Sequence, residues 1–184
     1  GGPQALKRLL GALPPDWPCP ILVVQHIASG FTEEFAGWLD SCCALSVKTA
    51  VAGEEALAGH VYVAPEDAHL GLVDDGSILI SRSSRIGGHR PSATFLFNSL
   101  AKTCPEESLG ILLTGMGEDG AVGLLRLRQS GGLTFAQNRE SCIVFGMPQA
   151  ATRLGAAERI VDLEHMASCM MEAIAHGKRE STRR

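Results

Sequence analysis

The alternation of short apolar runs with longer amphipathic stretches is the feature that most constrains how this chain can fold. The apolar runs predict strands at 21–24, 60–64, 109–113, 133–136 and 159–161. Runs this short are typical of strands buried on both faces. Between them, helical spacing of apolar residues predicts helices at 4–13, 32–42, 92–102 and 121–129, and a last one after Asp162. This order predicts an α/β domain with a doubly wound, mostly parallel sheet and helices on both faces.

A local antiparallel hairpin is also predicted. Segments 69–73 and 77–81 flank Asp75-Gly76, and a tight hairpin turn needs the positive φ that glycine accepts. Three predicted helices have a side chain suited to capping their first turn, namely Thr32, Ser92 and Asp162.

The size and charge of the chain limit its class. Its 184 residues suit one domain, and 45% apolar residues can form a sizeable core. We expect one domain over 1–177 and a solvated basic tail at 178–184. A net charge of −4 argues against a broad nucleic-acid or acidic-membrane surface. No apolar run reaches about 18 residues and no signal peptide opens the chain, so no membrane insertion is expected. The chain opens on Gly1 without an initiator Met, so its natural N-terminus is expected elsewhere.

The cysteines favour a reducing compartment. The six are Cys19, Cys42, Cys43, Cys104, Cys142 and Cys169. None forms a Cys-x-x-Cys pair, which argues against a zinc site, and small disulfide scaffolds are shorter and denser in cysteine. We therefore expect reduced thiols, a cytoplasmic protein and no metal.

Two polar residues follow predicted strands where ligands bind in open α/β sheets. His26 follows the strand at 21–24, and Asp119 follows the strand at 109–113. A His and an Asp on two strand ends can meet as the base and the orienting acid of a nucleophilic triad. The alternatives are structural: a buried histidine, and an Asp119 that caps the helix beginning at Ala121.

Glycines support the catalytic interpretation. Gly115, Gly117 and Gly120 allow sharp turns and expose amides that can stabilise an oxyanion. Gly1-Gly2-Pro3 runs directly into a helix, which is typical of the second half of a nucleophile elbow. The helix N-terminus there favours a developing negative charge.

Taken together, the motifs resemble those of the CheB-type chemotaxis methylesterases over almost the whole chain. The matching segments are Gly1-Gly2-Pro3, Val23-Val24-Gln25-His26-Ile27, Gly30-Phe31-Thr32, Val61-Tyr62-Val63-Ala64-Pro65, Gly88-His89-Arg90-Pro91-Ser92, Leu113-Thr114-Gly115-Met116-Gly117-Glu118-Asp119-Gly120, Ala136-Gln137-Asn138 and Val144-Phe145-Gly146-Met147-Pro148.

The resemblance implies a doubly wound domain with a Ser-His-Asp triad. Such a domain would hydrolyse glutamate γ-methyl esters on methyl-accepting chemotaxis receptors, with glutamine deamidation in some members. It further implies His26 as general base, Asp119 as the acid that orients it, and the Met116 backbone amide as an oxyanion contact. Arg90 and Thr114 are weaker candidates for substrate binding. No metal or cofactor is implied, and a receiver domain can precede the catalytic one.

The chain departs from the family at the nucleophile. The family elbow reads Gly-x-Ser-Thr-Gly-Gly-Pro, so the serine is expected two residues before Gly1, together with a mid-sheet strand whose loss should leave an apolar gap. Ser29, three residues after His26, is a poor substitute because family members often have proline or alanine near there. Thr94 stands where aspartate is common, which bears on receptor recognition.

Two rival interpretations stay open. One is a non-catalytic module that kept only the receptor-docking surface, although docking needs neither His26 nor Asp119. The other is a small-molecule α/β hydrolase, which fits the triad but leaves the Gly-His-Arg-Pro-Ser and Phe-Gly-Met-Pro segments unexplained.

Overall fold

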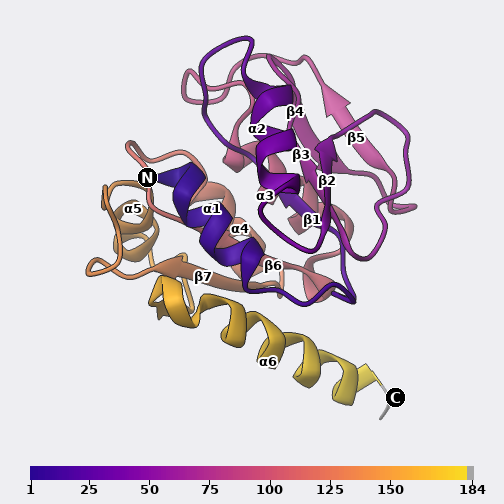
Figure 1. Cartoon of the computed structure of the whole chain (residues 1–184). Coiled ribbons are helices and arrows are strands. Elements are labelled where there is room, and N and C mark those ends of the chain that lie inside the picture. Colours follow the sequence, from indigo (N-terminus) through magenta and orange to yellow (C-terminus); the bar gives the residue numbers. More distant parts are fainter. Residues whose placement is uncertain (182–184) are drawn as a thin grey trace.

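The computed structural model describes the backbone of residues 1–181 and the side chains of residues 1–175 (Figure 1). Its strands are β1 (Ile21–Val23), β2 (Ser46–Thr49), β3 (His60–Val63), β4 (His69–Leu72), β5 (Ile78–Ser81), β6 (Leu109–Leu112), β7 (Leu133–Gln137) and β8 (Arg159–Val161). Its helices are α1 (Gly2–Gly11), α2 (Thr32–Asp40), α3 (Ala93–Thr103), α4 (Ala121–Gln129), α5 (Met147–Arg153) and α6 (Leu163–Ser181), with a 3-10 turn η1 (Pro105–Glu107).

Two parallel sheets of three strands each form the centre of the domain. Their strand orders are β2-β3-β1 and β6-β7-β8. In the first sheet Ile21 pairs with Val61, and in the second Leu109 pairs with Leu133. β4 and β5 form a separate antiparallel hairpin. The predicted mostly parallel architecture and hairpin are confirmed, with the described parallel strands divided between two sheets.

Helices cover both faces of these sheets, as the sequence predicted. One core joins α1, α2 and α6 to the sheets, and the other joins α3, α4 and α5 to their opposite faces. Neighbouring residues of one strand point to opposite cores because side chains alternate along a strand. On β3, Val61 belongs to the first core and Tyr62 to the second. Phe135 and Ala136 divide in the same way on β7.

The helix starts differ in part from those predicted. α1 begins at Gly2, two residues earlier than expected. Thr32 does not cap α2; it is the first helical residue, and Phe31 stands at the cap position without a side-chain hydrogen bond. Ser92 does cap α3, because its hydroxyl accepts a hydrogen bond from the Phe95 amide. Asp162 also acts as predicted, since its carboxylate accepts from the Glu164 amide at 2.9 Å.

Three elements were not predicted, namely β2, α5 and the short turn η1. β2 alternates exposed and buried residues, and Val47 is its one fully buried side chain, so it lacks the apolar run of a central strand. α5 is seven residues long, too short for a helical period to be evident, although Pro148 in its first turn is a start signal. α6 continues to Ser181, so the predicted tail at 178–184 begins within its backbone, and 182–184 lie outside the described residues. In the described part of the chain, no helix is long and apolar enough to cross a membrane.

Close packing of α3 on α4 depends on Gly123. A Cβ at this position would lie 2.8 Å from the carbonyl oxygen of Thr94 and 2.9 Å from its Cα. Both atoms are backbone, so an added methyl group would push the helices apart. We expect Gly123→Ala to lower the free energy of unfolding by about 1–3 kcal/mol, as overpacking typically does. Urea denaturation of the purified protein would measure it.

The matched control is Gly37→Ala in α2. No atom lies within 4 Å of a Cβ placed at Gly37. This variant should therefore gain about 0.5–1 kcal/mol from the better helix propensity of alanine. Equal effects of the two substitutions would contradict the steric explanation.

Candidate active site

His26 and Asp119 meet, as the sequence predicted, at the carboxyl ends of β1 and β6. His26 lies three residues beyond β1, and Asp119 lies in the loop between β6 and α4. The His26 Nε2 atom is 2.9 Å from Asp119 Oδ2. The Asp119 side chain is 3% exposed and that of His26 is 28% exposed, so the ring remains open to a reacting group while the carboxylate does not.

The Asp119 carboxylate accepts hydrogen bonds from four groups. Besides His26, the Ser92 hydroxyl donates at 2.7 Å, the Ala93 amide at 2.7 Å and the Thr94 amide at 3.2 Å. Burial acts to raise the pKa of Asp119, but these hydrogen bonds outweigh it and hold the pKa well below its usual value. The acid is therefore a carboxylate at neutral pH and cannot take a proton from the histidine.

Asp119 is bound at the N-terminus of α3, where free amides favour a negative charge. The alternative, that Asp119 merely caps α4, is wrong: Gly120 is the cap residue there, with φ of 88° and no side-chain hydrogen bond. Thr94 closes the same loop, because its hydroxyl accepts from the Gly120 amide at 2.8 Å. Sequence reasoning missed these roles of Ser92 and Thr94, although amides at a predicted helix start were a usable signal.

The ring of His26 has one hydrogen bond and one stacking contact among the described residues. A carboxylate can only accept, so Nε2 carries the proton and Nδ1 is the basic nitrogen of the neutral ring. The His89 ring stacks on it with centroids 4.3 Å apart and planes 13° from parallel. Sequence reasoning had not assigned a role to His89.

Met116 lies in the loop that leads to Asp119. Met116 is 83% exposed, and among the described residues its backbone amide has no hydrogen-bond acceptor. The preceding turn is fixed, because the Gly115 amide donates to Val144 O at 3.1 Å and Gly115 O accepts from the Met147 amide at 2.9 Å. A fixed turn with a free amide suits the predicted oxyanion contact, which stays a prediction.

Thr114 has a structural role that its motif did not predict. Its hydroxyl donates to Val144 O at 3.1 Å and accepts from the Val144 amide at 2.9 Å. Its own amide donates to Oε1 of the fully buried Gln137 at 2.8 Å, a residue that sequence reasoning did not single out. Thr114 therefore ties the end of β6 to the loop before α5, and substrate binding by it stays a prediction.

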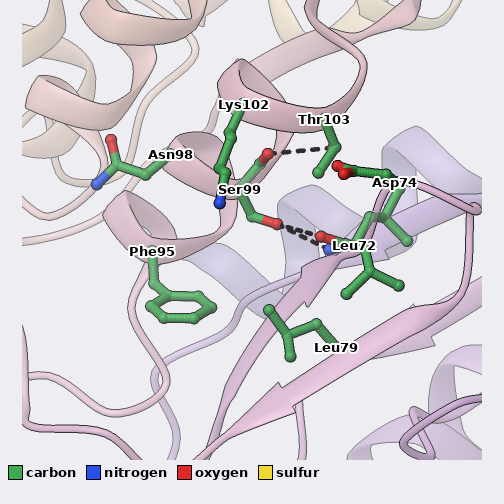
Figure 2. A pocket seen from close by; sticks show the side chains of 9 residues that line it. Leu72, Asp74, Leu79, Phe95, Asn98, Ser99, Lys102 and Thr103 are labelled. Carbon is green, nitrogen blue, oxygen red and sulfur yellow. Dashed lines mark hydrogen bonds between the residues drawn. The ribbon is translucent and has the colours of Figure 1, made fainter.

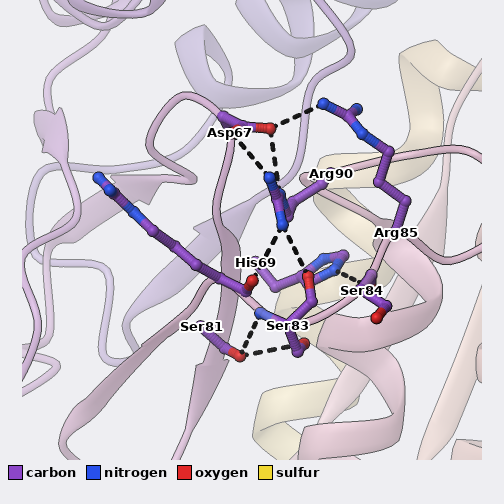
Figure 3. Close-up of polar contacts among 8 residues, drawn as sticks. Asp67, His69, Ser81, Ser83, Ser84, Arg85 and Arg90 are labelled. Atoms are coloured by element: carbon purple, nitrogen blue, oxygen red, sulfur yellow. Dashed lines mark hydrogen bonds and ion pairs between the residues drawn. The ribbon is translucent and has the colours of Figure 1, made fainter.

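Arg90 is similarly engaged within the protein (Figure 3). Its guanidinium binds both carboxylate oxygens of Asp67, at 3.0 and 2.7 Å. It also donates to the carbonyl oxygens of Arg82 and Ser83, each at 2.9 Å. The hydrogen bond and charge of Arg90 lower the pKa of Asp67. Arg90 thus anchors the loop after β5, and its direct contact with a substrate stays a prediction.

The first turn of α1 lies between the ends of β1 and β6. A Cβ on Gly2 would lie 2.5 Å from the Gln25 side chain, just after β1. A Cβ on Gly1 would lie 3.2 Å from the Thr114 side chain, just after β6. The start of α1 is therefore next to the strand ends that precede His26 and Asp119. Ser29, the poor substitute nucleophile, is exposed.

Two pockets lie away from His26 and Asp119. One, of about 420 Å³, lies between α3 and the β4–β5 hairpin (Figure 2), where the Ser99 hydroxyl holds both backbone groups of Leu72 at 2.8 Å. The other, of about 570 Å³, borders α1 and the residues Thr114, Gln137 and Ser141. Neither pocket is lined by His26 or Asp119. No cluster of potential metal ligands occurs in the part of the chain that the structure describes.

Comparisons with known proteins agree with this geometry. Residues 1–170 match the sequence profile of the CheB methylesterase family. A protein-glutamate methylesterase/protein-glutamine glutaminase of Myxococcus xanthus is 46% identical over 94% of this chain and 49% of its own length. One of Photorhabdus laumondii is 43% identical over 97% of this chain and 51% of its own length. The chain thus spans about half the length of these curated relatives.

A solved structure gives the same result in three dimensions. The crystal structure of the Thermotoga maritima CheB methylesterase catalytic domain superposes with a TM-score of 0.89 and 37% sequence identity. The alignment covers 94% of this chain and 93% of that domain. Profile, relatives and structure agree over nearly the whole length, and the chain belongs to the CheB methylesterase family.

Proposed function

We propose that this chain is the catalytic part of a cytoplasmic protein-glutamate methylesterase that hydrolyses γ-methyl esters on chemoreceptor glutamates. The observation that carries the proposal is the 2.9 Å bond between His26 and a buried, ionised Asp119. The names of the relatives supply the substrate class and add glutamine deamidation as a second activity.

The nucleophile is a serine two residues before the position of Gly1, at the end of a strand between β1 and β6. Both strands are edges of their parallel sheets among the described residues, and an edge strand offers unpaired N–H and C=O groups. The first turn of α1 contacts Gln25 after β1 and Thr114 after β6. A strand that enters α1 by a sharp turn would therefore place the residues just before Gly1 beside His26.

Each residue has a defined task in the reaction. The serine oxygen attacks the ester carbonyl carbon while His26 Nδ1 takes the hydroxyl proton. Asp119 keeps the ring in the Nε2–H tautomer and stabilises the imidazolium. The Met116 amide donates to the oxyanion of the tetrahedral intermediate. The imidazolium then protonates the leaving methoxide, and water attacks the acyl-enzyme to release glutamate and regenerate the serine. The mechanism requires no cofactor.

The partners of the whole protein follow from the relatives. Methyl-accepting receptors are the substrates, and the remaining half of the relatives' length accommodates a further module such as a receiver domain. The rival interpretation, a docking module, does not require an ionised Asp119 that accepts hydrogen bonds from four donors. A small-molecule hydrolase would share the triad, so only the choice of substrate separates it from the methylesterase.

Methanol release from methylated receptor tests the proposal. The longer chain that includes the residues before Gly1 should release methanol, and replacement of its upstream serine by alanine should abolish the release. The chain that begins at Gly1 should be inactive. Hydrolysis of a small methyl ester but not of methylated receptor would favour the small-molecule hydrolase. No hydrolysis of either substrate by the longer chain would favour the docking module.

A further inference from the structure

His89 lies against the catalytic histidine without being part of the triad. Its ring is parallel to that of His26 within 13°, at a centroid distance of 4.3 Å. Among the described residues neither ring nitrogen of His89 forms a hydrogen bond, so the stack is its one specific ring contact. A half-buried polar ring with no hydrogen bond of its own points to a function through its neighbour.

The loop that carries His89 is held firmly. Ile86 and His89 exchange two backbone hydrogen bonds, of 3.0 and 2.9 Å. The turn between them has φ of 56° at Gly87 and 85° at Gly88, values that favour glycine. Directly after it, Arg90 is anchored to Asp67 and to two backbone carbonyl groups. The backbone that carries the His89 ring is therefore held in place independently of His26.

The same short segment also holds the acid. Ser92, Ala93 and Thr94 donate to Asp119, three to five residues after His89. One continuous stretch of chain thus contacts both members of the catalytic pair: His89 contacts the base, and the start of α3 contacts the acid.

We propose that His89 is a positioning residue that fixes the plane of the His26 ring. The ring is attached at Cβ and hydrogen-bonded at Nε2, so it can still swing about the line that joins these two atoms. The stacked His89 ring removes this freedom, so that Nδ1 stays directed toward the nucleophile. The inference rests on the proposed function, because it assigns His26 as the base.

Substitutions in the full-length protein, with the residues before Gly1 included, test the inference. His89→Ala and His89→Gln both remove the ring. The glutamine variant fills more of the space than alanine does and so controls for a packing defect. Each should lower kcat about 10- to 100-fold, as loss of alignment does, with KM changed less than about twofold. His89→Phe keeps a stacking ring and should retain kcat within about threefold. The control is His60→Ala, because the His60 ring hydrogen-bonds the Ala58 carbonyl group and stacks on Tyr62 rather than on His26.

A readout without activity separates this inference from the proposed function. In ¹⁵N-histidine spectra, wild type and His89→Phe should show sharp ring signals of His26, whereas His89→Ala should broaden these signals, because the ring then moves while its Nε2–H stays bound to Asp119. Sharp His26 ring signals and unchanged kcat in His89→Ala would overturn the positioning role. Loss of kcat in His89→Phe equal to that in His89→Ala would do the same. If His26→Ala stays active, the proposed function fails, and the spectra still decide the role of His89.

Discussion

Replacement of His26 by alanine should lower kcat for receptor demethylation by about 10³-fold or more in the protein that contains the upstream serine. Without the imidazole, nothing takes the serine proton or returns it to the leaving methoxide. Losses of this size follow removal of the base from other triads. The oxyanion contact and substrate binding still accelerate the reaction and account for the rate that remains. Methanol release at saturating receptor is the measurement.

The control for His26→Ala is again His60→Ala, which lies at the start of β3. KM should change little in His26→Ala, because the base acts on the reacting atoms rather than on the receptor surface. Activity within tenfold of wild type would contradict the assignment of His26 as the base. A large rise in KM with unchanged kcat would instead assign His26 to receptor binding.

Asp119→Asn should lower kcat by about 10⁴-fold, as the same change does in other Ser-His-Asp triads. The amide keeps nearly the same shape but lacks the charge that stabilises the imidazolium. Its NH₂ group must also face donors, because His26 and Ala93 share one carboxylate oxygen and Ser92 and Thr94 share the other. The control is Glu118→Gln in the same loop, an exposed residue whose change should leave kcat unaffected.

The lowered pKa of Asp119 gives this variant a second, independent signature. A carboxyl group whose pKa is lower folded than unfolded stabilises the fold above the unfolded pKa, and this contribution is lost as the pH falls below about 4. The free energy of unfolding of wild type should therefore decline more steeply below pH 4 than that of Asp119→Asn. Parallel pH profiles in urea denaturation would show that the four hydrogen bonds do not hold the carboxylate as described.

Much of the fold could be predicted because apolar residues recur at different spacings in its strands and in its helices. The apolar run at 21–24 and the helical spacing at 121–129 led to β1 and α4, with the α4 bounds correct to the residue. β2 was missed because an edge strand with one buried residue has no apolar run. The cap position of α2 was misplaced because Thr32 has the chemistry of a cap, and only the backbone conformation of Phe31 shows otherwise.

The candidate site was predictable where a single residue carries the chemistry. His26 and Asp119 stand just after predicted buried strands. The carboxyl ends of parallel strands lie at the same edge of an α/β sheet, so residues that follow them can meet. The groups that hold them were not predictable, because Ser92 and His89 reach the pair only through the folding of distant segments. Arg90 and Thr114 illustrate the opposite case, since both lie in recognisable motifs but have their polar groups bound within the protein.

The bond between His26 and Asp119 has a consequence for the mechanics of the domain. His26 follows β1 in one parallel sheet, and Asp119 follows β6 in the other, so this bond spans the seam between the two. The bond is 2.9 Å long, and a separation of its two atoms by about 1 Å more would exceed hydrogen-bonding distance. The hydrogen bond between His26 and Asp119 therefore depends on the alignment of β1 with β6, and separation of these strand ends would part the proposed base from the acid that orients it.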